Sequence, residues 1–319
     1  MKDVIYLDYN ATTPMDPRVL EIMLPYFCDK YANPASNHAF GVEVNKSVKL
    51  AREQVASLIG CEPYEIVFTS GATESINLAI KGFATANKSK GNHIITVQTE
   101  HKAVLDVCHF LENNGFEVTY LPVQSDGLID LEVLKSAFRK ETILVSVMYA
   151  NNETGVIQPI KEISEISHFN NSFFMSDATQ AVGKMPVSVN DLGIDIMPFS
   201  GHKFYGPKGI GCLYIRGRRP NKVKLDAIQH GGGHENGFRS GTLNVPGVIG
   251  LAKAAEISLT EMHQNTHIIV PLRELLEKEL LKLPNSCING NPTKRLINTS
   301  NICFNNIDAD AIITGMNKV

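Results

Sequence analysis

The sequence has no strong excess of one charge, no long apolar run and no patterned set of cysteines. Its 319 residues carry a formal net charge of −3, which gives no reason to expect nucleic acid or an anionic membrane as a partner. No apolar run is long enough to span a bilayer, and the N-terminus lacks the apolar core of a signal peptide. With 43% hydrophobic and 20% charged residues, the composition favours a globular protein that works in the cytoplasm.

The six cysteines are widely scattered, and no two of them form a CxxC pair. The sequence therefore indicates neither a zinc site nor a disulfide framework, and a reducing compartment is expected. Two histidine pairs, His230 with His234 and His263 with His267, have a spacing of four residues. No cluster of thiols or carboxylates accompanies either pair, so we expect no metal site.

Strand and helix patterns alternate along most of the chain. Apolar runs predict seven strands, at 66–69, 94–98, 118–123, 143–149, 173–176, 194–199 and 211–215, with amphipathic helices at 73–86, 103–113, 131–138 and 160–169. This order is typical of an α/β fold with a mostly parallel sheet covered by helices on both faces. Outside it we expect a short strand within 4–14, a helix at 41–59, two helices at about 245–265 and 270–283, a strand at 302–305 and a helix from 309.

Polar motifs follow several of these strands, at the edge where α/β sheets bind ligands. The most distinctive one is the segment 200–211, which contains Ser200, His202 and Lys203 within a glycine-rich turn. A partly buried lysine can lose its proton near neutral pH and form a Schiff base with a carbonyl compound. The alternative for this lysine alone is a solvated side chain in a turn.

Asp177 ends a strongly apolar strand, where an unpaired carboxylate would be costly. A protonated pyridine nitrogen is a suitable cationic partner, and Gln180 follows three residues later to contact a ring oxygen. The alternatives for Asp177 are an arginine partner or a helix cap. Asp177 and Lys203 are close enough in sequence to lie at the same edge of the sheet.

Three further motifs offer partners for a phosphorylated ring. Ala72 and Thr73 lie in a small-residue turn before a helix, which favours an anion, although an ordinary N-cap has the same pattern. His101 can stack on a ring, and Asn152 can hydrogen-bond a carboxylate or a phenolic oxygen. A glycine-rich loop leads to Arg239 and Thr242, which can serve an anion. The alternatives are a surface or helix-capping histidine for His101 and a plain turn for the segment that contains Asn152.

Together these motifs resemble those of the cysteine desulfurases of the NifS/IscS type, which are fold-type-I enzymes dependent on pyridoxal 5′-phosphate (PLP) within the class-V aminotransferases. The resemblance extends over essentially the whole chain and is carried by these segments: 7–14, 70–75, 151–155, 177–180, 200–203 and 239–242. It implies a PLP-binding transferase with a large domain and a smaller α+β domain. We expect the large domain at 15–257 and the small domain at 1–14 and 258–319.

The resemblance implies a role for each candidate residue. Lys203 would hold PLP and take the α-proton of the substrate, and His101 would stack on the ring and act as an acid or base. Asp177 would pair with the pyridine nitrogen, Gln180 would bond the ring oxygen O3′, and Asn152 would hold substrate. The implied phosphate ligands are Ala72, Thr73, Ser200, His202 and, from the other subunit of a homodimer, Thr242.

The resemblance also implies the reaction and the partners. Family members convert L-cysteine to L-alanine and pass persulfide sulfur to acceptors such as iron–sulfur cluster scaffolds. In that family the sulfur-accepting cysteine and the arginine for the substrate carboxylate follow the helix that begins here near Asp308. None of the six cysteines stands at that position, and we expect Cys303 to be a small core residue. We therefore expect a small domain that is incomplete and a chain that does not finish sulfur transfer alone.

Two alternatives remain open. One is a protein that keeps the PLP fold as a scaffold for dimerisation or partner binding without catalysis. The other is a related PLP-dependent lyase or aminotransferase that acts on another amino acid.

Overall fold

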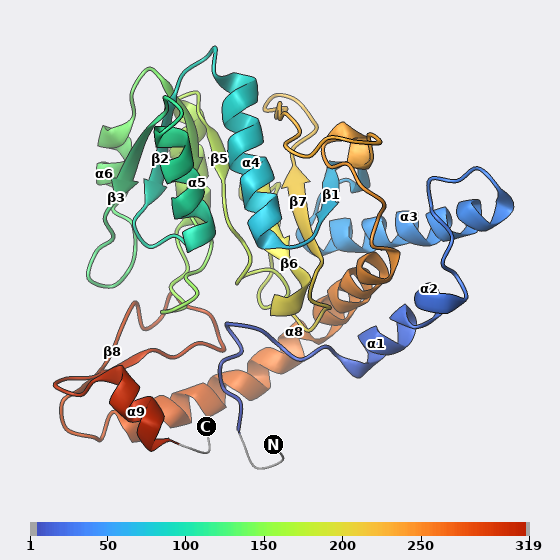
Figure 1. Ribbon diagram of the computed structural model, residues 1–319. Coiled ribbons are helices and arrows are strands. Elements are labelled where there is room, and N and C mark those ends of the chain that lie inside the picture. The colour runs from blue at the N-terminus through green and yellow to red at the C-terminus, as the bar shows by residue number, and fades with distance from the viewer. Residues whose placement is uncertain (1–4, 317–319) are drawn as a thin grey trace.

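A seven-stranded sheet forms the centre of the computed structural model, which describes residues 5–316 (Figure 1). The strands lie in the order β1-β7-β6-β5-β4-β2-β3. β7 is antiparallel to both of its neighbours, and all other neighbouring strands are parallel. The predicted mostly parallel sheet is therefore confirmed. Its strands are β1 (Ile66–Thr69), β2 (His93–Val97), β3 (Glu117–Leu121), β4 (Thr142–Ser146), β5 (Phe173–Met175), β6 (Ile196–Ser200) and β7 (Gly211–Ile215).

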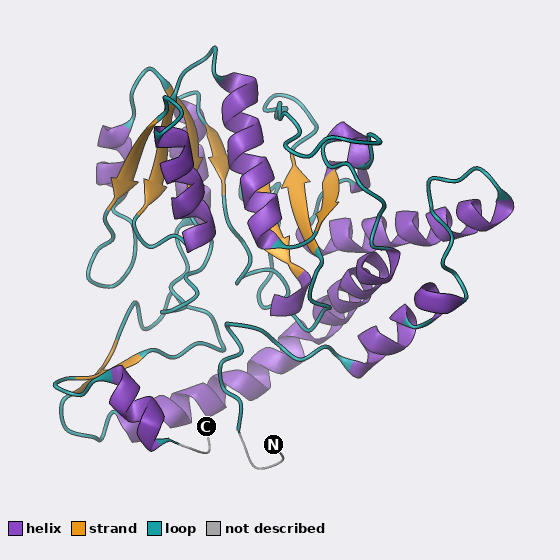
Figure 2. Cartoon of the chain, viewed as in Figure 1, coloured by secondary structure: helices purple, strands orange, loops and turns teal. Residues whose placement is uncertain are grey.

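Helices cover both faces of the sheet, as the alternating pattern predicts (Figure 2). α4 (Ala72–Asn87) and α5 (Lys102–Glu112) pack their apolar sides on one face. The other face is covered by α3 (Ala39–Ile59), α6 (Leu131–Ala137), α7 (Ile160–Phe169) and the first turns of α8 (Val245–Leu280). α1 (Pro17–Met23) and α2 (Pro25–Cys28) precede α3, and Asp16 caps α1 through its side chain.

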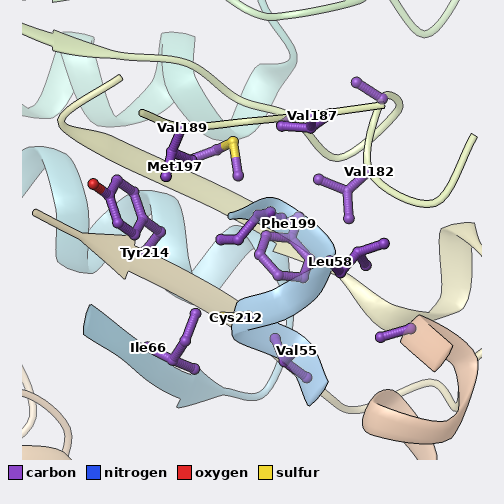
Figure 3. Packing of buried hydrophobic residues seen from close by; sticks show 14 of the residues in the cluster. Val55, Leu58, Ile66, Val182, Val187, Val189, Met197, Phe199, Cys212 and Tyr214 are labelled. Carbon is purple, nitrogen blue, oxygen red and sulfur yellow. The ribbon is translucent and has the colours of Figure 1, made fainter. Parts of the chain in front are cut away.

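The core beneath β6 fixes the strand end that carries the lysine motif. Phe199, on β6, is fully buried and belongs to the same apolar cluster as Val55 and Leu58 of α3 (Figure 3). Cys212 and Tyr214 of β7 complete this cluster. Because β6 is packed on this side, the residues that follow it are held in place by a rigid strand.

The expected break between two helices near residue 265 is wrong. α8 continues from Val245 to Leu280 with Pro271 inside it. His263 and His267 lie where the break was expected, and both are exposed on the surface of this long helix. A helix that leaves the core and continues through solvent needs no apolar side there, so its polar stretch is not a loop.

The N-terminal segment is not a strand in its described part. Residues 5–14 form a turn and an extended stretch, and their backbone bonds no neighbouring strand within the described chain. Instead the Thr13 N–H donates to the carbonyl oxygen of His202 at 3.0 Å, and the Asp16 N–H donates to that of Tyr205 at 3.0 Å. This segment therefore lies directly against the residues that follow β6.

Beyond α8 the chain forms a small hairpin of β8 (Ser286–Ile288) and β9 (Ile302–Phe304), followed by α9 (Ala309–Gly315). Asp308 caps α9, as expected. Cys303 lies on the predicted strand, but it is only partly buried, so the expected core position is wrong. The division at residue 257 remains a prediction, and α8 passes through that position without interruption. No helix within residues 5–316 has the length and apolar character needed to cross a bilayer.

Candidate active site

A cavity of about 900 Å³ opens at the carboxyl ends of the parallel strands. It is lined by the residues after β1, β2, β4, β5 and β6, together with the N-terminal segment. Nine of the ten predicted site residues line it, namely Ala72, Thr73, His101, Asn152, Asp177, Gln180, Ser200, His202 and Lys203. The tenth, Thr242, is exposed and lies outside the lining.

Lys203 ends the short 3₁₀ turn (Gly201–Lys203) that follows β6. Its Nζ donates to the carbonyl oxygen of Asn10 at 2.5 Å and to that of Ala11 at 2.9 Å. Burial lowers the pKa of Lys203, while Asp177 and Asp8 oppose that effect. The amine is therefore held at the cavity wall in a setting that favours its neutral, nucleophilic form more than water does.

Asp177 lies two residues beyond β5 and is only 5% exposed. Its Oδ1 accepts a hydrogen bond from the Thr179 N–H at 2.9 Å, and no cation within residues 5–316 forms an ion pair with it. Burial raises the pKa of Asp177. The structure thus holds a costly carboxylate that faces the cavity and would be stabilised by a cationic ligand.

The start of α4 has the geometry of an anion site. Gly71 is its N-cap residue without a side-chain cap, and the backbone N–H groups of Ala72 and Thr73 bond no acceptor in the described part of the chain. Gly211 packs against Gly71 so closely that a Cβ at position 211 would lie 2.5 Å from the Gly71 Cα. Free N–H groups at the start of a sixteen-residue helix favour a phosphate.

Two histidines face the cavity with different surroundings. The Nδ1 of His101 accepts a hydrogen bond from the Ala103 N–H at 3.1 Å, so Nε2 carries the proton of the neutral ring. The Nδ1 of His202 lies 3.1 Å from the Thr12 Oγ1. Burial, and secondly the charge of Lys203, lower the pKa of His202 to about 4, so this imidazole is neutral at physiological pH.

The two adjacent asparagines have separate tasks. Asn151 is buried and organises the turn, since its Oδ1 accepts from the backbone N–H groups of Glu153 and Thr154 and its Nδ2 donates to the Thr99 carbonyl. Asn152 lines the cavity and is available to a ligand there. The loop before Thr242 is fixed by Arg239, whose Nε lies 2.7 Å from the Glu74 Oε1 on α4.

Comparison with known proteins identifies the family. The class-V aminotransferase model matches residues 5–318. The cysteine desulfurase IscS of Neisseria meningitidis is 51% identical over all of this chain and 79% of its own length. A human cysteine desulfurase is 50% identical over 99% of this chain and 69% of its own length. This chain belongs to the cysteine desulfurases.

Solved structures agree with this membership. A NifS-like protein superimposes with a TM-score of 0.94 at 42% identity, covering 98% of this chain and 85% of the other. A structure described as SspA in complex with cysteine gives a TM-score of 0.85 at 39% identity, covering 97% and 86%. The predicted family, fold class and enzyme class are therefore confirmed, and cysteine desulfurases are PLP-dependent enzymes.

The cavity of this desulfurase fits PLP on structural grounds. The unpaired carboxylate of Asp177 suits a protonated pyridine nitrogen, the start of α4 suits the phosphate, and Lys203 supplies the amine. None of the six cysteines lines the cavity. No group of three or more possible metal ligands from His, Cys, Asp and Glu occurs in residues 5–316.

Sequence reasoning missed three residues around the cofactor cavity. Asn10 contacts Lys203, Gln180 and Asn152, although only its place in the N-terminal segment 7–14 marked it in the sequence. Lys184 contacts Gln180. Glu100 precedes His101 and is buried, with its Oε1 accepting from the backbone N–H of Met148 at 2.5 Å.

Proposed function

We propose that this chain acts on L-cysteine as a PLP-dependent desulfurase and releases L-alanine. The observation that carries the proposal is the pair formed by Asp177 and Lys203 in one cavity, a buried carboxylate without a cationic partner beside an amine whose pKa burial lowers. Bound PLP supplies an electron sink for the carbanion that forms when an amino acid loses its α-proton.

Each residue of the cavity has a defined task in this proposal. Lys203 would hold the cofactor through Nζ and, with its amine free, would take the α-proton of the substrate. Asp177 keeps the pyridine nitrogen protonated, and the Gln180 amide donates to the ring oxygen. His101 stacks on the ring and offers its Nε2 for proton transfer, and Asn152 orients the substrate.

The phosphate is assigned to the start of α4. The N–H groups of Ala72 and Thr73, the hydroxyls of Thr73 and Ser200 and the neutral imidazole of His202 can all donate to it. The resemblance to the family assigns Thr242 to the phosphate of a second subunit, and its exposed position outside its own cavity is compatible with that role. Exposed apolar side chains on α1–α3, which suit a homodimer interface, include Leu20, Phe27, Phe40 and Leu50.

The sulfur has to leave through a thiol. L-Cysteine and a thiol give L-alanine and a persulfide: the Cβ–S bond breaks, Cβ gains hydrogen, and the accepting sulfur is oxidised as the S–S bond forms. Since no cysteine lines the cavity, the accepting thiol comes from outside this lining. We propose an iron–sulfur scaffold as the final acceptor and the cytoplasm as the location.

The test measures alanine and sulfide formed from L-cysteine by the purified protein with PLP and excess dithiothreitol, which supplies the accepting thiol and releases the sulfur as sulfide. The proposal predicts equal amounts of both products and none with Lys203→Ala. A protein that binds PLP but forms neither product would instead be a scaffold. Alanine or pyruvate formed from another amino acid in preference to cysteine would identify a different PLP enzyme.

A further inference from the structure

A second lysine lies next to the proposed cofactor lysine. Lys184 follows β5 in the turn that also carries Gln180, and its Nζ lies 2.6 Å from the Gln180 Oε1. The same Nζ lies 3.5 Å from the Asn10 Oδ1, while the Asn10 carbonyl accepts from Lys203. Lys184 and Lys203 both line a smaller cavity of about 240 Å³ behind the active site.

The two sides of the Gln180 amide have neighbours of opposite kind. An ammonium group has only donors, so Lys184 must face the oxygen of the amide. A carbonyl has only acceptors, so the Asn10 oxygen, 2.9 Å away, must face Nε2. One N–H of Nε2 remains without an acceptor among residues 5–316, on a side chain that lines the active-site cavity.

We propose that Lys184 is a positioning residue, which fixes the Gln180 amide with its N–H toward the cofactor's ring oxygen. This inference rests on the proposed function, since it assigns a task toward PLP. Without the ammonium, only the Asn10 carbonyl fixes the amide. The rotated amide, which presents its oxygen to the negatively charged ring oxygen and is repelled by it, is then populated more often. Lys184 thus bonds Gln180 and not the cofactor itself, and it adds a positive charge behind that amide.

The charge of Lys184 depends on burial and on the charged groups around it. Burial, and secondly the charge of Lys203, lower the pKa of Lys184 to about 7. His202 is the other basic group nearby, and Asp16 and Glu261 line the small cavity. Both carboxylates bond Arg18, which partly satisfies their charge. A bound cofactor with a negative ring oxygen would favour the charged form of Lys184.

The experiment compares Lys184→Met with Lys184→Arg. PLP affinity is measured by titrating the cofactor-free protein, and the pH midpoint of the visible absorbance of bound PLP is measured without substrate. We expect Lys184→Met to weaken PLP binding about 3- to 10-fold, as for loss of one hydrogen bond. We also expect it to raise the midpoint by about half a unit or more, because with less positive charge nearby the ionised ring oxygen is less stable. Lys184→Arg should restore both values in part.

A matched control comes from the opposite side of the molecule. The Nζ of Lys90 donates to an amide oxygen, the Asn87 Oδ1, at 2.9 Å, outside the active-site cavity. Lys90→Met should change neither PLP affinity nor the midpoint. A double-mutant cycle tests whether Lys184 acts through Gln180. In a Gln180→Ala background, Lys184→Met should have little further effect on PLP affinity.

The outcomes separate this inference from the proposed function. A wild-type protein that does not bind PLP overturns both. A wild-type protein that binds PLP, with Lys184→Met unchanged in affinity and midpoint, overturns the positioning role alone. An equal loss of PLP affinity from Lys184→Met in the wild-type and the Gln180→Ala backgrounds also overturns the positioning role. If Lys184→Met does not fold, Gln180→Glu tests the same donor with Lys184 intact, and unchanged PLP binding by it contradicts the inference.

Discussion

The Nζ of Lys203 lies 2.5 Å from the carbonyl oxygen of Asn10, a residue 193 positions earlier in the chain. This contact joins the N-terminal segment to the strand end that carries the catalytic amine. The Asn10 side chain is fixed in turn, since its Nδ2 donates to the Asn152 carbonyl and to the Thr299 hydroxyl, each at 3.1 Å. The cavity is therefore assembled from segments that are remote in sequence, and Asn10 bonds several of them.

Asp177→Asn should separate catalysis from the stability of the cofactor-free protein. The amide cannot keep the pyridine nitrogen protonated, so we expect alanine formation to fall about 100-fold or more. Burial raises the pKa of Asp177 in the folded protein. The stabilisation that comes from keeping this carboxyl protonated is therefore fully present below its ordinary pKa. It is lost as pH rises through the pKa that Asp177 has in the folded protein.

Chemical denaturation of the cofactor-free protein tests the predicted effect of Asp177 on the pH dependence of stability. The free energy of unfolding of Asp177→Asn should decline less than that of the wild type as pH rises from 4 to 7. Parallel curves for the two proteins would show that the buried carboxylate has another partner.

Gly211→Ala should damage the phosphate site without removing any polar group. A Cβ there would meet the Gly71 Cα at 2.5 Å and the Phe199 carbonyl oxygen at 2.9 Å, and neither backbone atom can move without shifting the start of α4 or β6. We expect PLP affinity to fall at least about tenfold. Gly209→Ala is no matched control because Gly209 has a positive φ, so Gly315→Ala, with open space around its Cα, serves instead. Unchanged PLP binding by Gly211→Ala would contradict the assigned phosphate position.

Glu100 should act as a neutral hydrogen-bonding group. Burial, and secondly the nearby Asp177, raise the pKa of Glu100 well above its usual value. Glu100→Gln can still accept from the Met148 N–H and should fold normally, whereas Glu100→Ala leaves that N–H buried and should cost about 1–3 kcal/mol.

The pH dependence provides a second measurement at this position. The pKa of Glu100 is raised in the folded protein. The contribution of Glu100 to stability is therefore lost as pH rises from the ordinary pKa of a glutamate through the raised pKa of the folded protein. Thermal unfolding of Glu100→Gln should lack that decline. A wild-type decline that persists unchanged in Glu100→Gln would assign it to another group.

The sequence predicts most of the fold and nine residues of the cavity because both depend on local patterns. Apolar runs fix the strands, and polar residues directly after them, such as Asp177 and Lys203, must meet at one edge of a parallel sheet. Asn10 and Lys184 were not predicted, since their roles come from contacts across the fold. The break expected in α8 failed because a solvent-exposed helix and a polar loop have similar composition.

The most direct test of this account locates the cofactor on the chain. The PLP-loaded protein is reduced with borohydride, which fixes the cofactor to its lysine, and is then digested and mapped by mass spectrometry. The account predicts the pyridoxyl group on Lys203, with Lys184 unmodified. Modification of Lys184 instead of Lys203, or no modification of either lysine, would contradict it.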